Sequence, residues 1–176
     1  MRLWILFCSD LAIRSGTAAL ISPQNYDAQR GLLHFSTKLG EKLTLPVTAE
    51  ITTMLQTCDL HDPTPFVRQL HRATLAKEGR GHELTTKATY PHTLGTAFIR
   101  LRRKLGITRK LTPHDFRRTT AVKLYEQTGD ARDVQALLGH RTLASTIWYL
   151  DHDLRPVKRS ILELVKSPAW RKEESA

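Results

Sequence analysis

Two short stretches of the sequence are the most informative about the fold. The first is Thr112–Thr119, which reads TPHDFRRT, and the second is Leu137–Tyr149, which reads LLGHRTLASTIWY. In the first stretch, a threonine followed by proline and, three residues on, by Asp115 is typical of a helix N-terminus closed by a capping box. His114 and Arg117 then share one face of the first helical turn. The amide-rich start of a helix favours anions, although an ordinary surface turn explains this pair as well.

The sequence between and after these stretches predicts two further helices. The first helix covers about 113–127 and ends at Gly129. A second helix begins at Asp130, where Asp133 completes another capping box, and ends at Gly139, which places His140 at a bend. A third short helix starts at about residue 143 and carries Tyr149.

The N-terminal sequence predicts an amphipathic helix, because Leu3, Phe7 and Leu11 recur at helical spacing. Arg14 lies eleven residues after Leu3, about three turns at roughly 3.6 residues each, so we expect it on the same stripe. A guanidinium on an apolar face requires an anion nearby, or it reaches solvent or pairs with an internal carboxylate. The sequence alone leaves these alternatives open.

The remaining sequence predicts a β-hairpin and several helices. Alternating apolar residues flank the turn 38–41, namely Leu33 and Phe35 before it and Leu43, Leu45 and Val47 after it. We expect a short helix after Pro46, a helix over about 66–77, a helix capped by Thr93 with Leu105 on its apolar stripe, and an amphipathic helix over about 155–166. The expected fold class is mixed, mainly α with a small antiparallel hairpin, in one domain over 1–168 with a polar tail over 169–176.

The composition indicates a soluble, cytoplasmic protein with a polyanionic partner. The chain has 176 residues and a formal net charge of +10, and two cysteines are too few for a disulfide framework. The apolar run 3–8 is too short to cross a membrane. From Arg68 to Arg118 there are 13 basic residues against three acids, and the charges fall on predicted helix faces. This favours phosphate contact over a solvated basic face without a partner.

A set of residues suited to phosphate chemistry remains after other enzyme classes are set aside. The sequence lacks the glycine-rich phosphate loops, the serine-hydrolase elbow and a carboxylate cluster for a metal nuclease. Cationic and donor groups could stabilise a pentacoordinate phosphorus and a tyrosine could attack it, without a metal or another cofactor. These residues are Arg14, Lys38, His114, Arg117, His140 and Tyr149.

The arrangement of these residues closely resembles the signature boxes of the tyrosine recombinases, or phage integrases. That family has His-x-x-Arg, then Leu-Gly-His, then the nucleophilic tyrosine nine positions on, as in this chain. Upstream, the segment 12–16 resembles the first-arginine box and the segment 37–40 resembles the β-hairpin lysine box. The resemblance extends from about residue 3 to 165.

The resemblance implies a role for each residue. Tyr149 would attack the scissile phosphodiester and form a 3′-phosphotyrosyl link. Arg14 and Arg117 would hold the non-bridging oxygens, and Lys38 would protonate the departing 5′-oxygen. His114 would assist proton transfer at the nucleophile, and His140 would donate to the phosphate. We expect further backbone contacts to duplex DNA from Arg100, Arg103, Lys104 and Arg118.

The resemblance also implies partners, and this chain departs from the family pattern in two ways. The helix 155–166 would couple subunits of a tetramer on DNA. Thr17 stands where the family usually has an acidic residue, and the family's N-terminal core-binding domain is expected to be absent, so an accessory DNA-binding protein could supply it.

The expected function is site-specific DNA recombination or integration. The alternatives are a catalytically silent DNA-binding remnant of a mobile element and, with less support, a topoisomerase. An RNA-binding protein is disfavoured because no stacking motif is visible.

Overall fold

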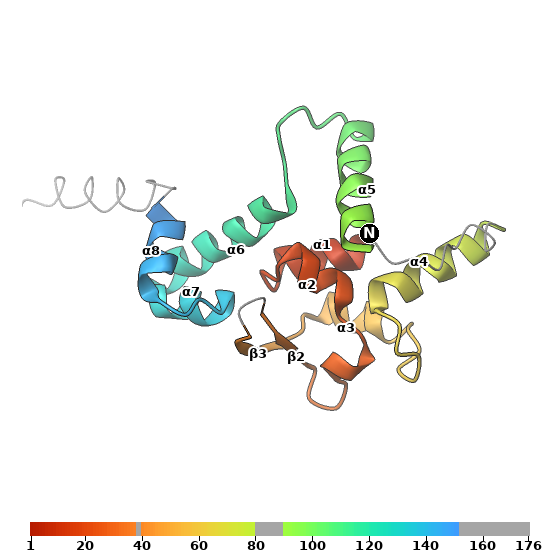
Figure 1. Ribbon diagram of the computed structural model, residues 1–176, viewed down its shortest axis with the longest axis horizontal. Coiled ribbons are helices and arrows are strands. Elements are labelled where there is room, and N and C mark those ends of the chain that lie inside the picture. The colour runs from red at the N-terminus through yellow and green to blue at the C-terminus, as the bar shows by residue number, and fades with distance from the viewer. Residues whose placement is uncertain (38–39, 80–89, 152–176) are drawn as a thin grey trace, which may run out of the picture.

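The computed structural model describes residues 1–37, 40–79 and 90–151, which form a mainly helical fold with a small antiparallel sheet (Figure 1). The elements are α1 (Arg2–Ser9), α2 (Ser15–Leu20), the 3-10 helix η1 (Pro23–Asn25), β1 (Tyr26–Asp27), β2 (Leu32–Ser36), β3 (Lys42–Pro46), α3 (Ala49–Leu55), α4 (Phe66–Lys77), α5 (Tyr90–Lys104), α6 (Pro113–Thr128), α7 (Ala131–Leu138) and α8 (Leu143–Asp151). This confirms the predicted fold class. The expected helix over 155–166 and the polar tail lie outside the described residues. No helix in the described ranges is long and apolar enough to cross a membrane.

The larger hydrophobic core is built by α1 to α5 and the sheet. Trp4 and Phe7 of α1 are buried, as is Phe66 of α4. The Trp4 indole donates to the backbone oxygen of Ser15 at 2.9 Å, which fixes α2 against α1. The strands pair in the order β1-β2-β3, all antiparallel, with Leu33 opposite Leu45. The predicted hairpin is therefore present, and the short strand β1 extends it.

Three aromatic rings connect α1, α5 and α6. The Phe98 ring lies with its centroid 6.0 Å from that of Trp4 and 5.7 Å from that of Phe116, both edge-on. The start of α5 differs from the prediction, since the helix begins at Tyr90 and Thr93 lies inside its first turn instead of capping it. Leu105 was also expected on the apolar stripe and is 63% exposed, because the helix ends at Lys104 and the chain turns away.

A smaller core holds α6, α7 and α8 together. It contains Val122, Val134, Leu138 and Leu150, all buried. Gly129 and Gly139 end α6 and α7 with φ of 69° and 59°, the left-handed conformation that glycine adopts without strain. In Figure 1 these three helices form the left-hand part of the molecule, beside α1, α2 and the hairpin.

One of the two predicted capping boxes is present. The carboxylate of Asp115 accepts from the backbone nitrogen and from the hydroxyl of Thr112, each at 2.7 Å. Asp130 caps α7 as expected by accepting from the backbone nitrogen of Arg132. In a capping box, the carboxylate of Asp133 would accept from the backbone nitrogen of Asp130. That nitrogen donates instead to the hydroxyl of Thr128 at 3.2 Å, so the second predicted box is wrong.

Candidate active site

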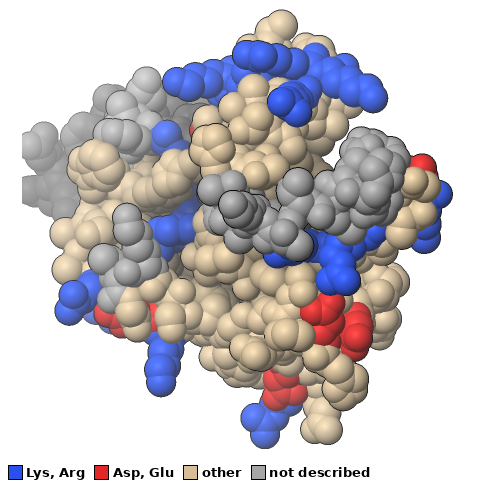
Figure 2. Space-filling model, turned by 45° about the vertical axis from the view of Figure 1, so that its right-hand side comes forward, with Lys and Arg blue, Asp and Glu red and all other residues tan. Residues whose placement is uncertain are grey.

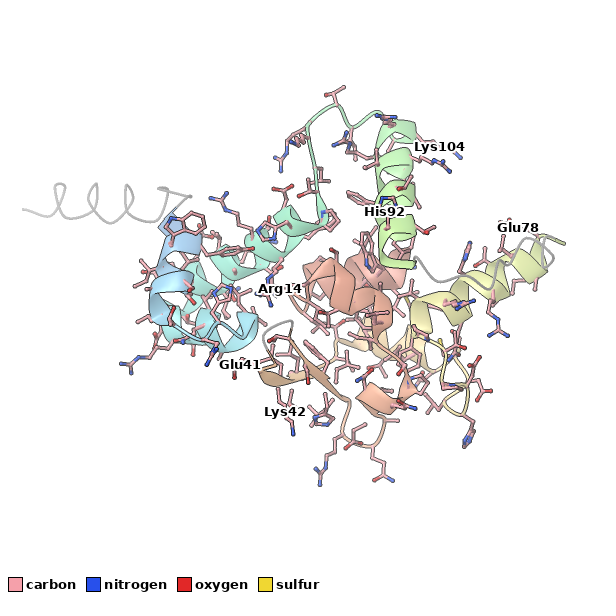
Figure 3. All side chains as sticks on the ribbon, in the orientation of Figure 1. Arg14, Glu41, Lys42, Glu78, His92 and Lys104 are labelled. Atoms are coloured by element: carbon pink, nitrogen blue, oxygen red, sulfur yellow. The ribbon has the colours of Figure 1, made fainter. Side chains whose placement is uncertain are left out.

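Arg14 is positioned by a turn and not by the stripe of α1. Helix α1 ends at Ser9, and the chain folds back so that the backbone nitrogen of Ile13 donates to the oxygen of Phe7 at 2.9 Å. Ala12 takes a φ of 51° at this turn, a conformation unusual for a residue other than glycine. Arg14 is the N-cap residue of α2, and Figure 3 shows it facing the space between α2 and the α6–α8 group. The predicted helical stripe through Arg14 is therefore wrong.

Arg117 is buried within the fold and has no carboxylate partner among the described residues. It is 4% exposed, and its guanidinium donates to the backbone oxygens of Ala12 and, at 2.7 Å, of Leu138. Burial, followed by the nearby Arg14, lowers the pKa of Arg117 to about 10. The side chain remains a cation at neutral pH.

The two histidines are placed by different helix ends. His114 lies in the capped first turn of α6, and loss of solvent, followed by Arg117, lowers its pKa. His140 follows Gly139, and its backbone oxygen accepts from the Gln135 side chain at 3.0 Å. Burial, then Arg117 and Arg14, lowers the pKa of His140 to about 4. Its imidazole is therefore neutral at neutral pH.

Tyr149 lies between the two histidine rings. Its ring centroid is 5.4 Å from that of His114 and 5.7 Å from that of His140, at interplanar angles of 88° and 80°. The hydroxyl is buried and makes no hydrogen bond of good geometry within the described part of the chain. Burial raises the pKa of Tyr149, and Arg117 is the largest of the cationic influences that oppose the rise. The phenol oxygen therefore has hydrogen-bonding capacity that the described residues do not use.

These side chains surround one pocket of about 780 Å³. Its lining residues are Arg14, His114, Arg117, His140, Arg141, Thr142, Ala144, Ser145, Trp148 and Tyr149. None of them is acidic, and no group of His, Cys, Asp or Glu in the described residues is suited to hold a metal ion. Guanidinium and imidazole groups around a tyrosine suit an anion such as a phosphate ester.

The structure brings together five of the six predicted chemical residues: Arg14, His114, Arg117, His140 and Tyr149. Lys38 lies outside the described residues. Arg118 is close enough to lower the pKa of His114 and Tyr149.

The three other predicted DNA contacts lie elsewhere. Arg100, Arg103 and Lys104 are exposed near the end of α5 and do not line the pocket. Figure 2 shows lysine and arginine side chains gathered at the top of the molecule, where α5 ends in Figure 1.

The hairpin is docked against the turn that carries His140. A Cβ atom added to Gly139 would lie 2.8 Å from Cδ1 of Leu43 and 2.9 Å from Cγ2 of Thr37. An ion pair of 3.3 Å joins Nε of Arg141 to Oε1 of Glu41, and Figure 3 shows Glu41 at the hairpin end nearest α7. The chain therefore needs glycine at 139 both for its backbone conformation and for this close approach.

Three residues of the site were not predicted from the sequence. Arg141 lines the pocket, Gln135 holds the backbone of His140, and the hydroxyl of Thr146 lies 3.0 Å from Nδ1 of His140. The available signal for Thr146 was its position three residues before Tyr149, one helical turn away on the same face.

The structure is that of a mainly helical domain with a small antiparallel sheet, in which a tyrosine lies within a cationic pocket. Residues 1–155 match the model of the phage integrase family. The chain therefore belongs to that family.

Curated relatives agree with this assignment. The chain is 29% identical over 145 residues to the tyrosine recombinase XerC of Chlamydia trachomatis serovar D, which covers 82% of this chain and 44% of that protein. It is 28% identical over 168 residues to the putative integrase/recombinase y4eF of Sinorhizobium fredii, covering 92% of this chain and 61% of that protein. The chain thus spans between about two fifths and three fifths of these relatives.

Solved recombinase structures share the fold. The XerH site-specific recombinase in a post-cleavage complex with a palindromic difH substrate superposes with a TM-score of 0.61 at 18% identity, over 97% of this chain and 46% of that one. The XerA recombinase gives a TM-score of 0.61 at 19% identity, over 94% of this chain and 61% of that one.

Proposed function

We propose that this chain carries the catalytic chemistry of a site-specific DNA recombinase that cleaves and rejoins strands through a 3′-phosphotyrosyl intermediate. The observation that carries the proposal is the position of Tyr149, between two imidazoles and beside the guanidinium groups of Arg14 and Arg117. Membership of the phage integrase family and the fold shared with recombinases bound to DNA support it.

The reaction balances without an external energy source. The Tyr149 oxygen passes its proton to the imidazole of His114 and attacks phosphorus to form a phosphotyrosyl ester. The bond from phosphorus to the 5′-oxygen breaks, and that oxygen takes a proton, for which the family pattern supplies Lys38. Arg14 and Arg117 hold the non-bridging oxygens. Attack by a 5′-hydroxyl of another strand reverses these steps and releases the tyrosine.

The partner in this proposal is duplex DNA. The acid-free lining of the pocket favours a phosphodiester, and Arg118, Arg100, Arg103 and Lys104 supply further contacts to the backbone. We also propose that residues 1–168 act as the catalytic domain, with 169–176 as a tail. The helix expected over 155–166 would couple subunits of a tetramer. A further DNA-binding domain or an accessory protein would supply the remaining contacts to DNA.

The test is covalent trapping on DNA. The protein is incubated with nicked suicide duplexes whose central segment is randomised. Because of the nick, a strand that is cleaved loses the short fragment needed for religation. A denaturing gel then separates covalent protein–DNA adducts. The parent chain should form an adduct, while Tyr149→Phe should bind the same duplexes and form none.

Two results would count against the proposal. Salt-sensitive binding to duplex DNA without any adduct would favour a catalytically silent DNA-binding remnant. An adduct that persists in Tyr149→Phe would assign the nucleophile to another residue. Recovery of the sequences that do react would identify the preferred site.

A further inference from the structure

The hydroxyl of Thr146 is a buried polar group that the proposed chemistry does not itself use. Thr146 is 0% exposed, and its Oγ1 lies 3.0 Å from Nδ1 of His140. It occupies the turn of α8 that precedes Tyr149. This contact therefore links the nucleophile's helix to the second histidine of the site.

The hydrogen-bonding pattern of Thr146 differs from that of other helical threonines in this protein. Seven threonines in the described helices donate to the backbone oxygen four residues earlier: Thr52, Thr53, Thr74, Thr96, Thr119, Thr120 and Thr128. Within the described residues, the hydroxyl of Thr146 has only His140 as a partner. A buried hydroxyl proton without an acceptor is unfavourable, so the proton of Thr146 points at Nδ1.

The direction of this hydrogen bond determines which imidazole nitrogen of His140 carries the proton. Burial and the neighbouring arginines hold the pKa of His140 at about 4, so the ring carries a single proton at neutral pH. If Nδ1 accepts from Thr146, that proton is on Nε2. His140 lines the pocket, and with Nδ1 already occupied, Nε2 is the nitrogen left for a ligand.

The contact acts on the ring and not on the backbone. The side chain of Gln135 donates to the backbone oxygen of His140 at 3.0 Å, and the backbone nitrogen of His140 donates to the oxygen of Gln135 at 3.2 Å. These two bonds hold the turn without Thr146. Removing the Thr146 hydroxyl should therefore free the imidazole while the main chain stays in place.

We propose that Thr146 is a positioning residue that holds His140 as the Nε2–H tautomer, so that a neutral donor faces the scissile phosphate. The identity of the acceptor rests on the proposed function. The tautomer itself follows from the hydrogen bonds of the free protein. The two parts can therefore be tested separately.

The first measurement is nitrogen NMR of the protein labelled with ¹⁵N-histidine, at neutral pH and without DNA. The His140 signals are assigned by their loss in His140→Gln. The proposal expects nitrogen shifts and proton couplings of an imidazole protonated at Nε2. Protonation at Nδ1, or fast exchange between both tautomers, would overturn it whether or not the chain cleaves DNA.

The second measurement compares Thr146→Val with Thr146→Ser in the adduct assay. Valine keeps the shape of the side chain and removes the hydroxyl, whereas serine keeps the hydroxyl. We expect valine to slow adduct formation by about tenfold or more, with unchanged duplex affinity and mixed His140 tautomers, and serine to remain near the parent rate. Thr119→Val, which removes an exposed helical hydroxyl, is the matched control.

The outcomes separate the two proposals. Parental rates in Thr146→Val, or equal loss in the valine and serine variants, would overturn the positioning role. Failure of the parent to form any Tyr149-dependent adduct would overturn the proposed function while the NMR result still decides the tautomer. If thermal melting shows that the valine variant does not fold, the parent spectrum and the serine variant decide.

Discussion

The guanidinium of Arg117 donates to the backbone oxygen of Leu138 at 2.7 Å and also binds the backbone oxygen of Ala12. One carbonyl precedes Arg14, and the other ends α7 just before the turn that carries His140. A single buried side chain thus fixes the position of the first arginine relative to the second histidine. Arg117 is a structural link as well as a proposed phosphate ligand.

The first prediction concerns this link. Arg117→Lys should lower the free energy of unfolding by about 2 kcal/mol or more, because an ammonium lacks the planar fork that reaches both carbonyls and leaves at least one buried acceptor unpaired. Arg118→Lys, which changes the adjacent, less buried arginine, should shift stability by less than about 0.5 kcal/mol. Urea unfolding measures both. Equal stability of the two variants would show that the carbonyl bonds contribute little.

Gly139 supports a second prediction, about the docking of the hairpin. Gly139→Ala should destabilise the fold by about 2–4 kcal/mol, since it combines left-handed strain with a Cβ atom only 2.8 Å from Leu43. Gly129→Ala is the matched control, because its φ is 69° and nothing lies within 4 Å of its added Cβ. Strain alone should destabilise that variant, by about 1–2 kcal/mol. Equal losses would argue that the hairpin moves aside freely.

The capping box at Thr112 yields a third prediction. Thr112→Ala removes a hydroxyl bonded to Asp115 and should cost about 1 kcal/mol of stability. It should also slow adduct formation, because His114 lies in the turn that this box closes. Thr119→Ala on the exposed face of the same helix should change neither quantity. Unchanged melting and unchanged activity in Thr112→Ala would contradict the role given to the helix start.

A fourth prediction concerns pH. The pKa of His140 is lowered from 6.5 to about 4 in the folded protein, so the unfolded chain takes up this proton first as the pH falls. Stability should therefore decrease as the pH drops through the window from 6.5 to about 4, and rise again with pH. His114, whose pKa is also lowered, adds to the same slope. His140→Gln should have a shallower slope in chemical unfolding, and an unchanged slope would contradict the pKa shift.

The sequence predicted the parts of the site that depend on local signals. Thr112 with Asp115, Gly129 and Gly139 mark helix ends through capping and backbone conformation, which neighbouring residues determine. The family resemblance then identified His114, His140 and Tyr149, and the structure places them around one pocket.

The parts that the sequence did not predict depend on distant contacts. Arg14 follows a turn in which Ala12 takes a positive φ, and no local residue type signals that conformation. Thr93 sits inside α5 because the helix starts earlier, at Tyr90. The pairing of Thr146 with His140 and of Glu41 with Arg141 arises only when α8 and the hairpin pack beside the same turn.

Mass spectrometry of the trapped adduct identifies the nucleophile, which we propose is Tyr149. Nuclease and protease digestion of the adduct leaves a short nucleotide on the residue that attacked the DNA. The sequence contains four tyrosines, Tyr26, Tyr90, Tyr125 and Tyr149. We expect a nucleotide on the peptide that contains Tyr149 and on no other. A nucleotide on another tyrosine, or on a serine or histidine of the pocket, would contradict it.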